Sequence, residues 1–356
     1  MSKNRNHFIR IICCFLLVFS LMMSMFYSFA DAKNKNAEEV SLMFTGDFLF
    51  SKDYPPFRAY ISRGKDISKC IDPKIIKKMK AVDYMVMNNE FTYTDRGSAT
   101  KGKKFTFRAY PYMAEELNKM GVDLVSLANN HAYDYGEVSL LDTMKTLDDV
   151  NVKYVGAGKN ISEAEKPVYF KKNGIKIAIL AATSIERMAN PDTKAATKTE
   201  AGVARCLDTK RLEKNIKKAK KKSDIVIVFV HWGTEGTNYI DSYQKKQAKA
   251  IAKAGADVIV GAHPHVLQKI DYIGDVPVVY SLGNFWFNSS TRDTGMFNVT
   301  VGKDGVKKCQ FIPCIQKSLK TTLLEGKQKN RLLDFMRKLS PNVIFDNDGY
   351  FVKNNK

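Results

Sequence analysis

Four of the five histidines in the 356-residue chain end or follow apolar, strand-like runs, and two carboxylates and an asparagine occupy the same kind of position. Imidazole nitrogens together with carboxylate and amide oxygens are the donors that Zn, Mn and Fe take in proteins. Because ligands gather at the carboxyl ends of strands in α/β folds, this coincidence predicts a divalent-metal site there. The residues concerned are Asp47, Glu90, Asn130, His131, His231, His263 and His265.

Taken one at a time, these motifs leave other interpretations open. His263 and His265 lie two residues apart and reach a common centre if their segment is extended, but such a pair is a weak signal alone. His231 ends an apolar run, where a buried histidine with satisfied hydrogen bonds is an ordinary core feature. Asp47 also fits a turn or a helix N-cap, and Glu90 also fits a surface loop.

The loop over residues 129–136 concentrates polar groups in a short space. Its sequence, Asn-Asn-His-Ala-Tyr-Asp-Tyr-Gly, holds His131 and, three residues later, Asp134. Asp134 either orients the His131 imidazole or caps the helix that follows. In the first case the two residues form a candidate acid–base pair, because an imidazole exchanges protons near neutral pH.

A repeated order of strand, polar loop and helix surrounds these residues and predicts an α/β fold. Apolar runs predict strands over 40–45, 84–87, 124–127, 225–230, 257–260 and 278–282. Apolar spacing and end signals predict helices over 72–80, 113–120, 137–150, 208–222 and 243–254. The turn at 172–174 predicts a hairpin between 168–170 and 175–181, and the turn at 304–305 predicts another.

The first 32 residues are typical of an export segment. Lys3, Arg5 and Arg10 precede an uncharged, mostly apolar stretch over 11–30. Small residues near its end resemble a signal-peptide cleavage site, while the stretch approaches the ~20 residues that span a bilayer. A cleaved signal peptide and an uncleaved anchor both remain open. Both put the rest of the chain at the extracytoplasmic face of the membrane or outside the cell.

The chain is strongly basic, with a formal net charge of +20, of which +17 remains without the three cations of the N-terminal segment. A hydrophobic fraction of 44% excludes a disordered chain. The basic excess fits an anionic membrane, an envelope polymer or nucleic acid, and it also fits a general lysine bias. The export segment and the lack of a recognisable nucleic-acid module argue against nucleic acid.

A set of motifs follows in order between residues 40 and 300: Gly46-Asp47, Asn88-Asn89-Glu90, Asn129-Asn130-His131, His231-Trp232-Gly233, Gly261-Ala262-His263-Pro264-His265 and Ser281-Leu282-Gly283-Asn284. This set resembles the capsule-synthesis CapA/PgsA family of bacteria. That family is in turn similar to calcineurin-like metallophosphoesterases. The resemblance puts the family domain at 38–315, after a signal peptide or anchor at 1–32, and leaves 316–356 as a basic C-terminal extension.

The resemblance implies a four-layer α-β-β-α sandwich of the metallophosphoesterase type with one or two divalent ions, Mn, Zn or Fe. It implies that Asp47 and His265 hold the first ion and that Glu90 bridges to the second. The other ligands of the second ion would be Asn130, His231 and His263.

The resemblance also implies roles for residues outside the ligand set. His131, with Asp134, would protonate a leaving oxygen, and Arg108 would meet an anionic substrate. A surface arginine in an ion pair is the other interpretation of Arg108. The chain departs from the metallophosphoesterase pattern in having Leu49 where a histidine is usual and Glu90 where an aspartate is usual. The first ion therefore has few evident ligands.

Two functions follow as expectations. The first is a membrane-anchored or secreted protein of poly-γ-glutamate capsule biosynthesis or export, which binds the acidic polymer or another anionic envelope polymer. Its partners would be the capsule synthase and export components. The alternative is an extracytoplasmic metal-dependent phosphoesterase that acts on a phosphate ester of the cell envelope.

Overall fold

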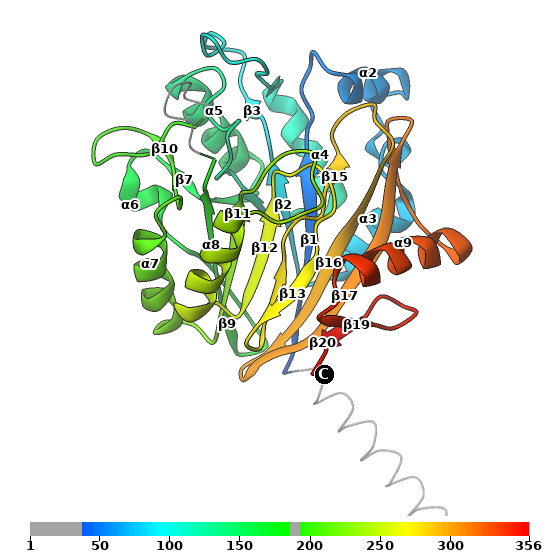
Figure 1. Ribbon diagram of the computed structural model, residues 1–356. Coiled ribbons are helices and arrows are strands. Elements are labelled where there is room, and N and C mark those ends of the chain that lie inside the picture. The colour runs from blue at the N-terminus through cyan, green and yellow to red at the C-terminus, as the bar shows by residue number, and fades with distance from the viewer. Residues whose placement is uncertain (1–37, 186–192, 356) are drawn as a thin grey trace, which may run out of the picture. The chain divides into compact units, whose positions relative to one another are not determined.

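Two β-sheets pack face to face at the centre of the computed structural model, which describes residues 38–185 and 193–355 (Figure 1). The larger sheet contains, in spatial order, β18 (Lys320–Leu323), β17 (Gly305–Lys317), β16 (Arg292–Gly302), β1 (Val40–Phe48), β2 (Tyr84–Asn89), β5 (Leu124–Ser126) and β6 (Lys153–Val155), with β15 (Asn284–Trp286) also paired to β1. The smaller sheet contains β13 (Ile270–Ile273), β14 (Val276–Val279), β12 (Val258–Ala262), β11 (Ile225–His231), β9 (Ile175–Thr183) and β8 (Val168–Lys172).

The wholly apolar strand β11 shows how the sequence specifies the layers. Ile225, Ile227 and Phe229 pack between the two sheets, against residues of β1 such as Phe44. The valines that alternate with them face α7 (Lys210–Lys220) and α8 (Ser242–Lys253). A strand that is buried on both faces needs apolar residues at every position, because successive side chains point to opposite faces.

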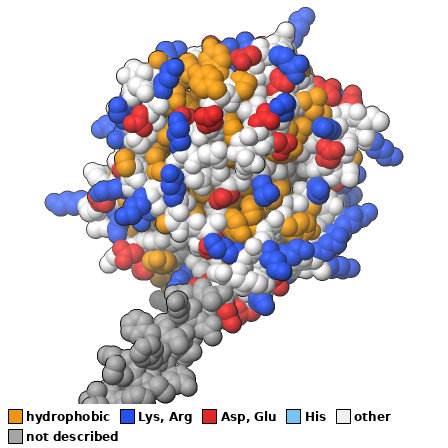
Figure 2. All heavy atoms as spheres, turned by 180° about the vertical axis from the view of Figure 1, so that it is seen from behind, with side chains coloured by type: hydrophobic (Ala, Val, Ile, Leu, Met, Phe, Trp, Pro, Cys, Tyr) orange, Lys and Arg blue, Asp and Glu red, His pale blue; other side chains and the backbone are white. Residues whose placement is uncertain are grey.

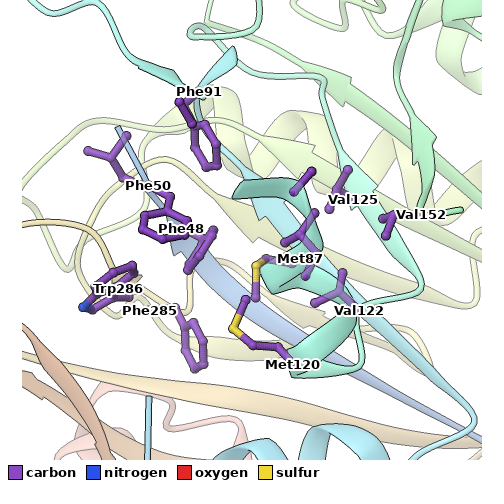
Figure 3. Packing of buried hydrophobic residues seen from close by; sticks show 14 of the residues in the cluster. Phe48, Phe50, Met87, Phe91, Met120, Val122, Val125, Val152, Phe285 and Trp286 are labelled. Carbon is purple, nitrogen blue, oxygen red and sulfur yellow. The ribbon is translucent and has the colours of Figure 1, made fainter. Parts of the chain in front are cut away.

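The outer face of the larger sheet is covered by α3 (Pro73–Ala81), α4 (Glu115–Met120) and α5 (Glu137–Asp149). Phe48 and Trp286, from the neighbouring strands β1 and β15, meet Met87 of β2 and Met120 of α4 in this layer (Figure 3). The layers therefore run helix, sheet, sheet, helix, and the predicted mixed α/β fold is confirmed.

Several predicted elements are found with small shifts at their ends. The hairpin over 168–181 is confirmed, since β8 and β9 pair antiparallel and the turn residues Asn173 and Gly174 both have positive φ, 52° and 74°. Helix α3 begins after Asp72, whose carboxylate accepts a hydrogen bond from the Lys74 N–H. Shorter elements are α2 (Pro55–Ser62), α6 (Ile161–Ala164), β3 (Thr92–Tyr93), β4 (Arg108–Ala109), β7 (Ala157–Gly158) and β10 (Gly202–Val203), with 3₁₀ turns at Ile67–Lys69 and Pro111–Ala114.

The C-terminal segment, set apart in the sequence as a basic extension, packs onto the sandwich. Strand β18 joins the edge of the larger sheet, and α9 (Gly326–Leu339) buries Leu332, Leu333 and Met336 in the core between the sheets. A final hairpin pairs β19 (Val343–Phe345) with β20 (Phe351–Lys353). These elements belong to the same compact unit as residues 40–315. The apolar stripe of α9 explains this, because it can be buried only against another element.

The predicted signal peptide or anchor at 1–32 lies outside the described residues. Within 38–185 and 193–355, no helix is both long and apolar enough to cross a bilayer. Among the cysteines of the same ranges, Cys70, Cys309 and Cys314 are buried free thiols, and Cys206 is also buried.

Candidate metal centre

Asp47 lies inside β1 and not in a turn or at a helix N-cap. The parallel registers of β1 set it opposite Asn88 of β2 on one side and Asn284 of β15 on the other, next to irregularities in both ladders. The preceding Gly46 permits this arrangement, because a Cβ atom there would lie 1.9 Å from the Gly283 carbonyl oxygen. A side chain at position 46 would thus separate the strands that position Asp47.

The histidine donors come from the other sheet. His231 is the last residue of β11, paired with Ala262 of β12, and His263 and His265 follow β12 directly. Both of the latter have left-handed backbone conformations, with φ of 97° and 59°. A non-glycine residue in this region costs on the order of 1–3 kcal/mol, and such strain concentrates at functional sites. The two imidazoles are therefore held in costly positions beside the carboxylates of the larger sheet.

The donor atoms form two overlapping groups, and in each group every pair of atoms lies within 4.8 Å. One group joins Glu90, His263 and His265, and the other joins Asp47, Glu90 and His231. Glu90 is the shared member, as expected for a carboxylate between two ions. The groups divide differently from the ion assignment that the family resemblance implies, because His263 is grouped with His265 and Asp47 is grouped with His231. Two shorter contacts join residues that the resemblance assigns to the same ion: His265 Nδ1 lies 3.0 Å from Asp47 Oδ2, and His231 Nε2 lies 2.8 Å from Asn130 Oδ1.

Glu90 carries the clearest sign of a missing ligand. Its carboxylate is fully buried, and Oε1 has no hydrogen-bond partner among the described residues. That oxygen lies 3.7 Å from His231 Nε2 and 3.8 Å from His265 Nε2. A buried, unbonded carboxylate oxygen costs several kcal/mol unless a cation or a donor neutralises it. A divalent ion between this oxygen and the two imidazoles would do so, and the residues present therefore fit a metal.

Asn88 links the two carboxylates and was not assigned a role from the sequence. Its amide nitrogen donates to Asp47 Oδ1 at 2.9 Å and to Glu90 Oε2 at 3.1 Å. Asn129 in turn donates to Asn88 Oδ1 at 3.2 Å. These amides hold Asp47 Oδ1 and Glu90 Oε2 in place by hydrogen bonds, and Glu90 Oε1 is left to bind an ion. Asn284 acts similarly on the other side, where its Oδ1 lies 2.9 Å from His265 Nδ1.

The pKa values of the two carboxylates are shifted in opposite directions. Burial raises the pKa of Glu90 well above its usual value, and the adjacent Asp47 charge raises it further. Burial also opposes ionisation of Asp47, but the hydrogen bond and the charge of His265 outweigh it, so the pKa of Asp47 is lowered. Without an ion, Asp47 is thus the anionic member of the pair, and Glu90 tends to hold a proton.

The histidines also differ from one another. Burial and the charges of His263 and His265 lower the pKa of His231 well below its usual value, so its imidazole is neutral and able to bind a metal. Burial would lower the pKa of His265 too, but its hydrogen bond to Asp47 raises it instead. Because Nδ1 of His265 faces two oxygen acceptors, it carries the proton and Nε2 faces the centre.

These shifts predict that metal binding weakens on acidification. An entering ion must displace the proton that the raised pKa retains on Glu90, and any second proton on His265. We expect the apparent Kd for Mn²⁺ to rise at least about tenfold between about pH 8 and about pH 6. Titration calorimetry in two buffers of different ionisation enthalpy would measure the number of protons released when Mn²⁺ binds. Binding without proton release would contradict the raised pKa of Glu90.

His131 stands beside this cluster and is fixed by Asp134. Its Nδ1 lies 2.7 Å from Asp134 Oδ2, and the same oxygen accepts from the Phe107 N–H at 2.6 Å. Helix α5 has Gly136 at its N-cap and no side-chain cap, so Asp134 orients the imidazole and does not cap the helix. Nε2 is then the ring nitrogen that can exchange a proton with a ligand. Burial lowers the pKa of His131, although Asp134 opposes this effect.

Lys103 completes this arrangement and is the functional residue that sequence reasoning missed most clearly. Its side chain is only 5% exposed, and its ammonium binds the Asp134 carboxylate and the Asn130 carbonyl oxygen. The residue lies in the polar loop 94–104, a composition that predicts a solvated lysine. No signal in the sequence distinguishes it from Lys101 or Lys104.

Arg108 does not form an ion pair with any described residue. Its guanidinium lies 4.3 Å from the centre of the Tyr135 ring, and its buried Nε has no hydrogen-bond partner in the described part of the chain. The alternative interpretation of Arg108 as a surface arginine in an ion pair is therefore not supported by the described residues. Arg108 sits next in sequence to Phe107, whose ring centre is 4.2 Å from that of His131.

Comparison with known proteins agrees with the resemblance noted in the sequence. A family model described as "Bacterial capsule synthesis protein PGA_cap" matches residues 41–289. The chain is 32% identical to the "PGA biosynthesis protein CapA" of Bacillus subtilis (strain 168), over 88% of this chain and 81% of that protein. It is 31% identical to the "Capsule biosynthesis protein CapA" of Bacillus anthracis, over 85% of this chain and 74% of that protein.

Among solved structures, a hypothetical protein from Thermus thermophilus covers 78% of the chain at 13% identity, with 99% of its own length matched and a TM-score of 0.47. The family model spans every residue of the candidate metal centre, from Asp47 to Asn284. The chain belongs to the bacterial capsule synthesis family described by that model.

Proposed function

We propose that this protein acts in poly-γ-glutamate capsule biosynthesis or export and binds the acidic polymer next to a divalent-metal site. The observation that carries the proposal is the convergence of Asp47, Glu90, His231 and His265 around an unbonded carboxylate oxygen, in a chain of the capsule synthesis family. The names of the two Bacillus relatives, which refer to PGA and capsule biosynthesis, support the choice of polymer.

The metal part of the proposal assigns one or two Mn, Zn or Fe ions to a metallophosphoesterase type of site. Asp47 and His265 would hold one ion, and Asn130, His231 and His263 would hold the other, with Glu90 between them. Such an ion supplies a fixed positive charge that binds carboxylate or phosphate oxygens. Leu49 offers no donor to the first position. The second position is therefore the stronger one.

The protein would work at the extracytoplasmic face of the membrane, anchored by its N-terminal segment or secreted after cleavage. The apolar stretch over 11–30 and its basic flank support this placement. The capsule synthase and export components would be its partners, a choice supported by the names of the two Bacillus relatives.

Metal analysis of purified residues 33–356, wild type and Asp47→Asn, tests the site. We expect one or two ions in the wild-type protein and a loss of about one ion in the variant. Asp53→Asn, at an exposed position, is the matched control and should retain the wild-type content. Wild-type protein that takes up no Mn²⁺, Zn²⁺ or Fe²⁺ at neutral pH would sink the metal proposal. Absence of binding to poly-γ-glutamate would sink the polymer proposal separately.

The alternative function, an extracytoplasmic phosphoesterase, is favoured by the 2.7 Å contact between His131 and Asp134. This contact leaves a ring nitrogen positioned for proton transfer beside the metal donors. If the protein is such an enzyme, we expect His131→Ala to lower Mn²⁺-stimulated phosphodiester hydrolysis by about 10²- to 10⁴-fold with unchanged metal content. Metal-loaded wild-type protein without turnover on phosphomonoesters or phosphodiesters would rule this function out.

A further inference from the structure

The positive charge of the protein is dispersed and does not by itself locate a polymer site. Figure 2 shows Lys and Arg side chains spread over the rear face among acidic and hydrophobic ones. On α7, the most basic helix, Lys220 pairs with Asp257 and Arg211 pairs with Glu165. A binding surface must therefore be identified from cations that lack acidic partners and from what surrounds them.

One stretch of chain meets this condition. Residues 101–112 contain four cations and no acid. Lys103 is buried against Asp134, but Lys104, Arg108 and Lys52, which lies in a turn beyond the end of β1, make no ion pair among the described residues. The two segments are joined by a hydrogen bond of 2.9 Å from the Lys52 N–H to the Arg108 carbonyl oxygen.

Each of these three cations lies over an aromatic ring. Lys52 Nζ is 4.9 Å from the centre of the Tyr110 ring, and Lys104 Nζ is 5.2 Å from that of Phe105. Two rings of the segment are unusually open, Phe105 at 49% and Tyr112 at 53% exposure, and Tyr112 stacks on Tyr110. Exposed large rings beside uncompensated cations are typical of a recognition surface. We call Lys52, Lys104, Phe105, Arg108, Tyr110 and Tyr112 the aromatic–basic strip.

The strip is continuous with the candidate metal centre. Phe107, between its members, lies 4.2 Å from the His131 ring and 5.9 Å from the Phe287 ring, centre to centre. The Phe287 ring is in turn 4.5 Å from that of His265. A chain of ring contacts thus connects the exposed strip to an imidazole of the centre. A long ligand bound at the centre would have the strip beside it.

We infer that the aromatic–basic strip binds an extended segment of a polycarboxylate chain as it leaves the metal centre; this inference rests on the proposed function. The repeating unit of poly-γ-glutamate has a free carboxylate and two methylene groups. Separated cations can pair with successive carboxylates, while the ring faces cover the methylene groups. Flat, adjacent rings also limit the conformational entropy lost on binding, because they have few rotatable bonds.

Fluorescence anisotropy with labelled poly-γ-glutamate tests the strip. The triple variant K52Q/K104Q/R108Q removes its three uncompensated cations. The triple variant K217Q/K218Q/K221Q, on the exposed face of α7, removes the same charge elsewhere. At moderate salt we expect the strip variant to bind at least about tenfold more weakly than wild type, with a shallower salt dependence. The α7 variant should remain within about twofold of wild type.

The outcomes separate the inference from the proposed function. If wild-type protein does not bind the polymer, the proposed function fails. If wild type binds the polymer but both triple variants lose the same affinity, or only the α7 variant loses affinity, the aromatic–basic strip is not the binding site and the proposed function stands. Metal content of the strip variant should equal that of wild type, so that a lost ion cannot account for lost binding. Equal affinity for single-stranded DNA and for the polymer at the same salt would overturn the assignment of a polycarboxylate.

Discussion

Replacing Glu90 by Gln is expected to abolish most metal binding and to make the metal-free protein more stable. Glu90 Oε1 is buried without a hydrogen bond, and its pKa is raised well above the usual value by burial and by Asp47. A folded-state pKa above the unfolded one means that stability falls as pH rises through the interval between them. At about pH 8, Gln should therefore stabilise the chelated protein by about 1–3 kcal/mol.

The same substitution should remove the stabilisation that metal gives to wild type, which is about 2.7 kcal/mol at an ion concentration 100 times Kd. Urea denaturation with and without Mn²⁺ measures both effects. Glu115→Gln, at an exposed position in the first turn of α4, is the matched control and should change neither by more than about 0.5 kcal/mol. A Glu90→Gln protein that keeps its full metal content would remove Glu90 from the centre.

Replacing Asp134 by Asn is expected to destabilise the protein by about 3–5 kcal/mol. Asp134 is fully buried and binds the Lys103 ammonium, His131 Nδ1 and the Phe107 N–H. Loss of its charge removes the carboxylate that neutralises the buried Lys103 ammonium. The free energy of unfolding, obtained from urea titrations of both proteins, checks the magnitude.

A double-mutant cycle separates this explanation from a general sensitivity of the loop. Lys103→Met removes the buried cation, so Lys103→Met/Asp134→Asn should be more stable than Asp134→Asn alone by at least about 1 kcal/mol. Arg96 and Asp142 form the comparison pair, in which the arginine is exposed and the aspartate is partly buried, and Asp142→Asn should cost less than about 1.5 kcal/mol. Additive losses at positions 103 and 134 would argue against a buried ion pair.

The sequence predicted the candidate centre better than its surroundings. Asp47, Glu90, His231 and His265 could be picked out because each lies at or just after the end of an apolar run, and because histidine is rare in this chain. Their convergence follows from topology, since strands β1, β2, β11 and β12 are parallel neighbours within their sheets and end at the same edge. The local sequence pattern and the rule that parallel strands end at the same edge together predict that these four side chains converge.

Residues that act through burial could not be predicted in this way. Lys103 belongs to a polar loop, and only the distant contact with Asp134, 31 positions along the chain, makes it a buried residue. The bridging role of Asn88 depends on the register of β1 against β2 and on the irregularity between Phe44 and Asp47. Register and loop packing are set by long-range contacts, which no single-sequence pattern encodes.

The C-terminal segment shows a similar limit. Its polar strand β18, with the sequence Lys-Thr-Thr-Leu, lacks the apolar alternation that predicts a strand. It forms at the sheet edge because β17 extends to Lys317 and offers a pairing partner. Edge strands of this kind depend on the neighbour that they pair with more than on their own composition.

The centre draws its carboxylates from the larger sheet and its imidazoles from the segments that follow strands of the smaller one. An ion held there would link the two sheets at one end through bonds that form and break with metal binding and release. Cys70, Cys309 and Cys314 are free thiols, so none of these three cysteines links the sheets through a disulfide bond. Selection on such a link would maintain the donor set for the shape and rigidity of this edge of the two sheets, whether or not any bond is ever hydrolysed there.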